Sequence, residues 1–136
     1  MPRPPISLGR ICLTVSAVVT SIGTYAADWS ETHVLNPRWP PHAKFHNGQS
    51  MSLGLALGIL TVYYTWRPTA QPKDSLRTAA ILASLYYVTG LSGILYPGAL
   101  GVDPEFGEGF PQFWLFTAFT GLPWLGYLLE SRRLRR

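Results

Sequence analysis

Long stretches without a charged residue constrain the fold of this 136-residue chain more than any other feature. Four such runs cover residues 11–27, 47–66, 78–102 and 109–129, and nearly all acidic and basic residues lie between them. A helix of roughly 20 mostly apolar residues crosses a bilayer core about 30 Å thick, so each run is long enough, or nearly so, to span a membrane. Soluble domains carry about 25% charged residues, whereas this chain has 13%. The pattern predicts an all-α fold, a transmembrane four-helix bundle.

The expected spans cover about residues 7–27, 47–66, 77–97 and 110–129 of a single domain that takes in the whole chain, 1–136. A water-soluble four-helix bundle would carry polar stripes on the outer faces of its helices, and none of the runs has such a stripe. Gly54 and Gly58, four residues apart in the second run, predict a close approach to a neighbouring helix because small residues let helix backbones come together.

The basic residues predict the orientation in the membrane. Nine of the eleven Lys and Arg residues lie before the first run, between the second and third, or after the fourth, and only Arg38 and Lys44 lie on the other side. Short loops rich in Lys and Arg face the cytoplasm, so both termini are expected there, in a multi-pass protein of the endoplasmic reticulum. The C-terminal SRRLRR is expected to contact membrane lipids, through their anionic headgroups, and no nucleic acid. A cleaved signal peptide over the first run is an open alternative that would leave three spans.

Polar chemistry is concentrated in the segment DWSETHVLNPRWPPHAKFHN, residues 28–47. Pro41 suits the first turn of a helix, on which His42 and His46 would share one face. Carboxylates and histidines together suit acid–base catalysis, because His titrates near neutral pH and a carboxylate can orient it. The candidate catalytic residues are Asp28, Glu31, His33, His42 and His46. The candidate substrate-binding residues are Trp29, Arg38, Trp39, Asn47 and Gln49, together with Tyr86 and Tyr87 of the third run.

The aromatic residues of this segment predict that it folds back over the end of the bundle. Trp29, Trp39 and Phe45 would each contribute ~1.5–3 kcal/mol when buried, and such a fold would bring a carboxylate within hydrogen-bonding distance of a histidine. The loop between the third and fourth runs holds three acids and no base. Its acids are expected to pair with Arg38 and Lys44 across the mouth of the bundle.

Two other interpretations of these residues stay open. His42 and His46 have an acceptable spacing for two metal ligands, and Glu31 or His33 could supply a third. The sequence has no HExxH motif that would fix such a set, so we expect neither a metal nor a cofactor. In a purely structural interpretation, the tryptophans anchor the chain at the membrane interface and the histidines are incidental.

The string ETHVLNPRWPPHAKFHNGQSM, residues 31–51, resembles the signature of an uncharacterised family of small four-span membrane proteins found mostly in filamentous fungi, and the resemblance spans most of the chain. That family is similar in architecture to the DoxX-like proteins and, more loosely, to the four-helix sterol isomerases that include the emopamil-binding protein. The second likeness concerns architecture alone, and fold does not transmit function. The resemblance implies an enzyme that acts on a lipophilic metabolite of a fungal biosynthetic pathway.

Three functions of different classes follow. The first is an integral membrane enzyme that isomerises or cyclises a lipophilic small molecule by cofactor-free acid–base chemistry, since the sequence has no redox motif, nucleotide-binding loop or activated nucleophile. The second is a non-catalytic scaffold or lipid-binding accessory subunit, in contact with a second copy of the chain or another membrane protein. The third, a transporter, is weakened because no ionisable residue lies in the middle of a run. An enzyme requires the acids and histidines to converge on a cavity, whereas a scaffold leaves them on the surface.

Overall fold

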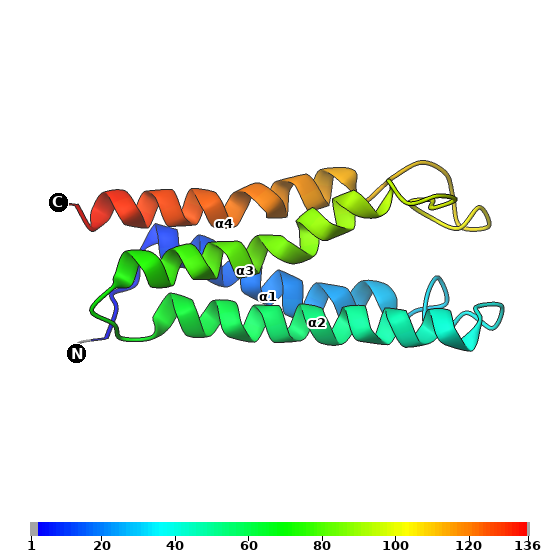
Figure 1. Cartoon of the computed structure of the whole chain (residues 1–136), viewed down its shortest axis with the longest axis horizontal. Coiled ribbons are helices and arrows are strands. Elements are labelled where there is room, and N and C mark those ends of the chain that lie inside the picture. The colour runs from blue at the N-terminus through cyan, green and yellow to red at the C-terminus, as the bar shows by residue number, and fades with distance from the viewer. Residues whose placement is uncertain (1–2, 136) are drawn as a thin grey trace.

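The computed structural model describes residues 3–135 and consists of four helices that run up and down alongside one another (Figure 1). They are α1 (Leu8–Asp28), α2 (Pro41–Trp66), α3 (Pro72–Gly93) and α4 (Phe113–Arg133). Each helix packs against the next one in sequence, and α4 packs back against α1, so the four form a closed ring. No strand occurs within residues 3–135. The predicted all-α four-helix bundle is therefore confirmed.

The two ends of the bundle differ in what they hold. The chain termini and the short α2–α3 connection lie at one end, the terminal end, and the segments 29–40 and 94–112 lie at the other, the loop end (Figure 1). Pro41 and Pro72 occupy the first turns of α2 and α3, where a missing N–H costs nothing. The prediction that Pro41 begins a helix is confirmed. Helix α3 ends before the expected boundary at residue 97, because Pro97 cannot continue a helix and disfavours helical backbone just before it.

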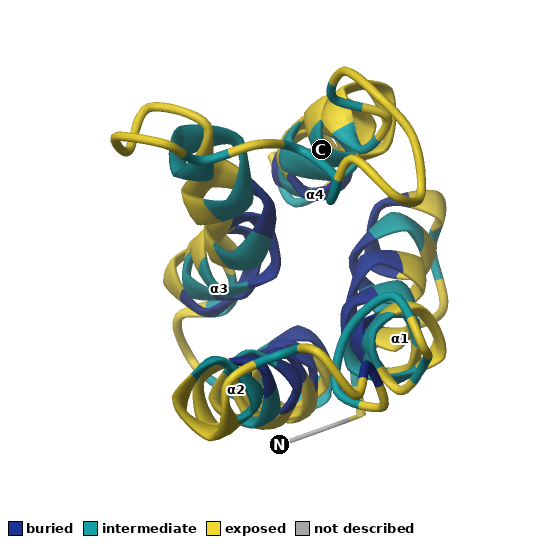
Figure 2. Cartoon of the chain, turned by 90° about the vertical axis from the view of Figure 1, so that its right-hand side faces the viewer, coloured by how far each residue is buried: buried dark blue, intermediate teal, exposed yellow. Residues whose placement is uncertain are grey.

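Much of the interior of the bundle consists of small and polar side chains, packed around a core that includes Leu13 and Leu76. Ser16, Thr20, Thr61 and Thr65 are buried, and each hydroxyl donates to the carbonyl oxygen four residues earlier at 2.7–2.9 Å. Large apolar side chains are exposed instead, among them Ile11, Val15, Val18, Ile22, Leu53, Ile59, Val88, Leu125 and Leu128. Figure 2 shows the buried residues turned toward the centre and the exposed ones turned outward. A water-soluble bundle has the opposite distribution.

Glycines let α1 approach both of its neighbours. A Cβ atom added to Gly58 would lie 2.6 Å from the carbonyl oxygen of Ala17, and one on Gly54 would lie 3.1 Å from the α1 backbone. At the terminal end Gly9 and Gly126 face each other. A Cβ on Gly9 would lie 2.5 Å from Gly126 O, and a Cβ on Gly126 would lie 2.7 Å from Gly9 O. Since a side chain at these positions would push the helices apart, the predicted close approach at Gly54 and Gly58 is confirmed.

A buried ion pair joins α1 to α4 at the terminal end. Arg10 and Glu130 are 4% and 1% exposed, and Arg10 Nε lies 3.4 Å from Glu130 Oε1. Arg133 donates to the same oxygen from Nε at 3.0 Å and from Nη2 at 2.8 Å, and the Ser7 hydroxyl donates to Glu130 Oε2. Arg10 also donates to the carbonyl oxygen of Thr65 on α2, so this one cluster ties three helices together.

Among the described residues, α1 is the one helix long and apolar enough to cross a membrane by length and composition. Two other kinds of helix meet the same criterion. One is the core helix of a soluble protein, and the other is a signal sequence near the N-terminus. The criterion therefore gives weak support to one of the four expected spans and no support to the other three.

Candidate functional site

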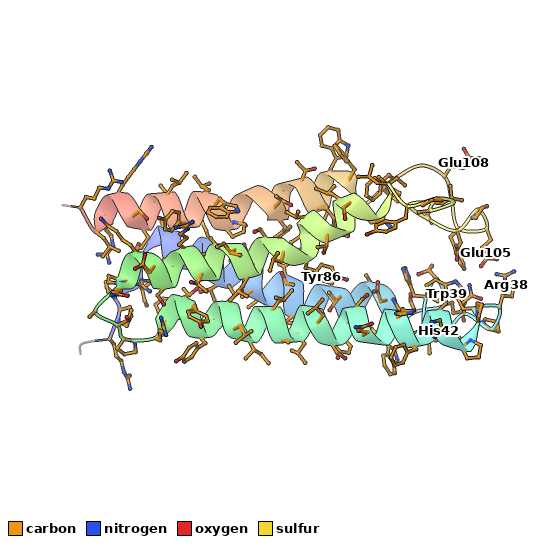
Figure 3. The ribbon with its side chains drawn as sticks, viewed as in Figure 1. Arg38, Trp39, His42, Tyr86, Glu105 and Glu108 are labelled. Atoms are coloured by element: carbon orange, nitrogen blue, oxygen red, sulfur yellow. The ribbon has the colours of Figure 1, made fainter. Side chains whose placement is uncertain are left out.

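The structure distributes the candidate residues over three separate places. Asp28, His33, Tyr86 and Tyr87 line a cavity inside the loop end of the bundle, and Asn47 contacts Asp28 from α2. His42, His46 and Gln49 lie together on an exposed part of α2. Arg38 and Trp39 bridge to the segment 94–112, while Glu31 and Trp29 are exposed. Figure 3 shows Tyr86 well inside the length of the bundle and Arg38, Trp39 and Glu105 together at its loop end.

The cavity has a volume of about 290 Å³ and lies between α1, α3 and α4. Its lining is Val19, Gly23, Thr24, Ala27, Asp28, His33, Tyr86, Tyr87, Gln112, Leu115 and Phe116. This volume is just below the range typical of small-molecule sites, which combine apolar walls with a few convergent polar groups. The cavity is therefore the main candidate site, and its size favours a small ligand.

Asp28 and His33 form the titratable pair of this cavity. Asp28 is the last residue of α1, and His33 Nε2 lies 3.7 Å from Asp28 Oδ1 after the chain has turned back. Asn47 donates to the other oxygen, Asp28 Oδ2, at 2.9 Å. Burial raises the pKa of Asp28, although the neighbouring His33 and the hydrogen bond from Asn47 act in the opposite direction. A carboxylate does approach a histidine as predicted, but 3.7 Å is longer than a hydrogen bond.

A chain of hydroxyl groups fixes which nitrogen of His33 carries a proton. The Ser30 hydroxyl donates to Ala27 O at 2.8 Å, so in its 2.8 Å contact with Thr32 Oγ1 the donor must be Thr32. Thr32 has then used its single proton, and in its 2.8 Å contact with His33 Nδ1 the donor must be the ring N–H. Neutral His33 therefore presents a bare Nε2 toward Asp28, 3.7 Å from its carboxyl oxygen.

Aromatic residues form the rest of the cavity wall. Tyr87 is 3% exposed, its hydroxyl is hydrogen-bonded to Thr20 Oγ1 at 3.2 Å, and its ring stacks on Phe119 with centroids 5.3 Å apart. Tyr86 and Phe116, with centroids 6.5 Å apart, also line a second cavity of about 220 Å³ that reaches α2. These two side chains thus line both the Asp28–His33 cavity and its neighbour.

Gln112 is a cavity residue that the sequence interpretation missed. Its Nε2 donates to Gly101 O at 2.6 Å, while its Oε1 is buried without a hydrogen-bond partner among residues 3–135. A buried acceptor without a partner is costly and is available to a donor on a bound ligand. The signal in the sequence was a polar amide among the aromatic residues near the start of the fourth charge-free run. Nothing in the sequence predicted that it lies near Asp28.

The two histidines of α2 do not reach the cavity. His42 Nε2 and His46 Nε2 lie 3.0 Å apart, and His46 Nδ1 contacts Gln49 Oε1 at 3.4 Å. All three side chains are exposed, and the His42 ring stacks on that of Phe45. Within the described part of the chain, no group of three or more His, Cys, Asp or Glu residues is close enough to hold a metal ion. The shared helix face is confirmed, but it is separate from the Asp28–His33 pair.

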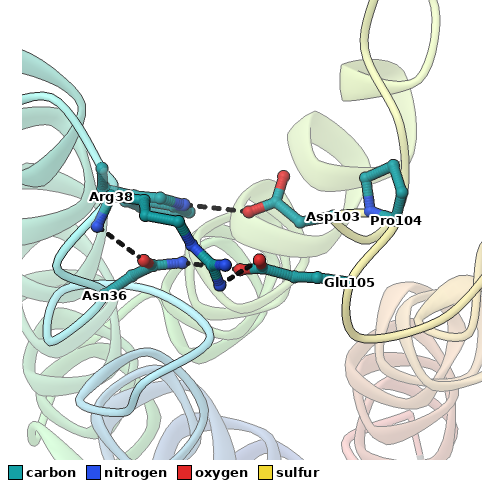
Figure 4. A pocket seen from close by; sticks show the side chains of 6 residues that line it. Asn36, Arg38, Asp103, Pro104 and Glu105 are labelled. Carbon is teal, nitrogen blue, oxygen red and sulfur yellow. Dashed lines mark hydrogen bonds and ion pairs between the residues drawn. The ribbon is translucent and has the colours of Figure 1, made fainter.

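The segment 29–40 is fastened to the segment 94–112 by polar contacts (Figure 4). Arg38 forms an ion pair with Glu105, and Asn36 Nδ2 donates to Glu105 Oε1 at 3.0 Å. Trp39 Nε1 donates to Asp103 Oδ2 at 2.9 Å. The predicted pairing of Arg38 with the acidic loop is confirmed. Arg38 and Trp39, proposed as substrate-binding residues, instead line a hollow of about 390 Å³ between the loops.

The predicted burial of the loop aromatics is confirmed in part. Trp39 is half-buried, whereas Trp29 and Phe45 are 61% and 65% exposed, so the expectation is wrong for these two. Trp29 follows Ile22 by seven residues, which is two helical turns, and so continues the exposed stripe of α1. Lys44 forms no ion pair among residues 3–135, unlike Arg38.

Comparison with curated proteins and with solved structures finds no match. One family model matches residues 12–136, a range that contains every residue of the cavity and the contacts between the two loops. Because this match covers nearly the whole chain, the protein belongs to the family of unknown function DUF6640.

Proposed function

We propose that this protein is an integral membrane enzyme that isomerises or cyclises a small lipophilic substrate by moving a proton, without a cofactor. The observation that carries the proposal is the position of Asp28 and His33 together in the wall of a largely apolar cavity inside the bundle. Titratable pairs with a perturbed pKa in a cavity are typical of active sites. The resemblance of residues 31–51 to fungal four-span proteins suggests a substrate from secondary metabolism.

The membrane part of the proposal is supported by the inverted distribution of side chains. The outer faces of all four helices carry exposed Leu, Ile and Val residues, while most of the buried positions are Ala, Gly, Ser and Thr. In lipid, apolar surfaces do not drive helices together, and small residues at the interfaces do so through close packing. The split of Lys and Arg supports four spans with both termini in the cytoplasm, and the membrane that we propose is that of the endoplasmic reticulum.

The chemistry follows from a proton acceptor, Nε2 of His33, placed beside the carboxyl group of Asp28. A polar atom of a substrate can lie within hydrogen-bonding distance of both Nε2 of His33 and the carboxylate of Asp28, because they are 3.7 Å apart. In an isomerisation, the bare Nε2 removes a proton from one substrate atom, and the pair returns a proton to another. Substrate and product then have the same composition, and no electron acceptor is needed. Gln112 Oε1 would accept a hydrogen bond from a hydroxyl or amine that orients the ligand.

To test the membrane part, membranes are prepared from cells that express the protein and are washed with alkaline carbonate, which removes peripheral proteins. We expect the chain to stay in the membrane pellet. A C-terminal reporter should be reached by a protease only from the cytoplasmic side. Release of the chain by carbonate would refute the membrane assignment, and a reporter accessible only from the lumen would refute the orientation.

The enzymatic part is tested by metabolite profiling of a strain that lacks the gene, complemented with wild type or variants at matched membrane abundance. Asp28→Asn and His33→Gln keep side-chain size and some hydrogen bonding but remove a group that can gain and lose a proton, so both should lower the restored metabolite by at least about 100-fold, as loss of a general acid or base typically does. Glu31→Gln and His42→Ala are matched controls outside the cavity and should restore it fully. Full activity of both cavity variants would eliminate the acid–base mechanism.

A non-catalytic scaffold or lipid-binding accessory subunit is the second candidate, favoured by the exposure of Glu31, His42 and His46 on the outside of the loop end. In that function these residues contact a partner membrane protein or a second copy of the chain. The same complementation experiment separates the two candidates. A scaffold predicts that His42→Ala and His46→Ala abolish the phenotype while Asp28→Asn leaves it intact, which is the reverse of the enzymatic expectation.

A further inference from the structure

Another pocket lies at the terminal end of the bundle, at the opposite end from Asp28 and His33, and its lining is strongly basic. It has a volume of about 160 Å³, and Arg3, Arg10, Arg67 and Arg133 line it together with proline residues of the segments before α1 and α3. A water molecule occupies about 30 Å³ in the liquid. The pocket is therefore large enough for a group of a few heavy atoms.

The charges of this pocket are not balanced by the protein. Glu130 is the one carboxylate in contact with the four arginines among the described residues, and it already serves both Arg10 and Arg133. Arg3 and Arg67 have no acidic partner within residues 3–135. Four guanidinium charges against one carboxylate leave a net charge of +3. Like charges gathered in a pocket repel one another, and an anion bound between them would relieve this repulsion.

Two of the arginines are held in place with donors to spare. Arg67 Nε donates to Ser75 Oγ at 2.8 Å, and its guanidinium lies over the Tyr64 ring at 4.5 Å. That leaves its terminal nitrogens without a hydrogen bond in the described structure. Arg10 is 96% buried, yet its Nε has no hydrogen-bond partner among residues 3–135. Its ion pair with Glu130 Oε1 at 3.4 Å lacks hydrogen-bond geometry, so this donor is available to an oxygen of a bound ligand.

We infer that this pocket binds a phosphate group. Guanidinium groups present parallel N–H donors that match the oxygens of phosphate, and several of them around one small cavity suit a compact oxyanion with more than one charge. The phosphate could belong to an anionic phospholipid or to a soluble phosphate compound, because both offer the same oxygens. The inference is independent of the proposed proton chemistry, and only its lipid form rests on the proposed membrane location.

The experiment uses the purified full-length protein. In neutral detergent, thermal unfolding is followed by tryptophan fluorescence while inorganic phosphate is titrated against sodium chloride of equal ionic strength. In parallel, the protein is placed in phosphatidylcholine bilayers with or without phosphatidic acid at a one-to-four ratio. The pocket variant is Arg3→Gln with Arg67→Gln, and the control is Arg77→Gln with Arg135→Gln, which removes the same charge from exposed positions outside the pocket. Arg3→Gln alone, at another exposed position, serves as a milder pocket variant.

We expect phosphate or phosphatidic acid to stabilise the wild type and the control alike, with an apparent affinity that falls at least about tenfold in the pocket variant. Saturable protection by inorganic phosphate identifies a soluble phosphate site, and protection only by phosphatidic acid identifies a lipid headgroup site. Equal loss in the pocket variant and the control, or equal protection by chloride, overturns the inference. Metabolite formation is measured separately, so failure here leaves the proposed function untouched.

Discussion

Replacing Glu130 with leucine should be one of the most destabilising single substitutions in this protein. Glu130 is 1% exposed and is the counter-ion of Arg10, which is 4% exposed and ties α1 to the Thr65 carbonyl on α2. Glu130→Leu keeps the side-chain size but leaves the Arg10 charge buried without a carboxylate. The loss is therefore one of charge compensation and not of packing.

The magnitude follows from burial. Removing one partner of a buried ion pair costs about 3–5 kcal/mol in the free energy of unfolding. Arg133→Gln is the matched control, because the Arg133 side chain is 44% exposed and can be solvated by water, so its loss should cost only about 0.2–1 kcal/mol. The double variant Arg10→Met with Glu130→Leu removes both buried charges. It should recover most of the stability lost in Glu130→Leu, since replacing both partners of a buried pair with apolar groups is often neutral.

The assay is reversible unfolding in mixed detergent micelles, followed by circular dichroism and tryptophan fluorescence. Wild type, the two single variants and the double variant are compared at neutral pH and equal ionic strength. A loss in Glu130→Leu no larger than that in Arg133→Gln would show that Arg10 is solvated in the folded state. A double variant less stable than Glu130→Leu would show that Arg10 contributes through its contact with Thr65 and not through charge pairing.

Three further outcomes are expected. Because burial raises the pKa of Asp28 above its ordinary value of 3.8, the folded state holds this proton more tightly than the unfolded chain, and stability is lost as the pH rises from the unfolded pKa through the folded pKa. Asp28→Asn should thus unfold at a higher temperature than wild type at pH 7 and lose this advantage at acidic pH, and a variant that is equally destabilised at both pH values would contradict the assignment. Gly58→Leu should destabilise the α1–α2 contact by about 1–3 kcal/mol, because its Cβ would lie 2.6 Å from Ala17 O, and unchanged unfolding would show that the helices can separate freely. Arg38→Gln should change the free energy of unfolding by less than about 1 kcal/mol, since the Arg38 side chain is 68% exposed, but should speed limited proteolysis of residues 94–112, and unchanged cleavage would mean that Glu105 does not fasten that loop.

The sequence by itself determined the helical architecture. Charge-free runs and proline positions are local properties, and they predicted four helices, the start of α2 at Pro41 and the shared face of His42 and His46. The close approach at Gly54 and Gly58 could also be predicted from the sequence, because the spacing of small residues on one helix determines the face that a neighbouring helix can approach. The exposure of Trp29 was not predictable, because the direction of a side chain just past a helix end depends on how the chain turns there.

Only the tertiary structure decided which candidate residues act together. Nothing in the sequence ranked the five acids and histidines of one segment above one another. In the structure, the turn of residues 29–33 places His33 beside Asp28, whereas His42 is exposed in the first turn of α2. Gln112 joined the cavity from the far end of the chain, as Arg133 joined Arg10 at the basic pocket. Such contacts depend on how each helix is rotated about its axis within the ring, and that rotation results from the packing of all four helices at once.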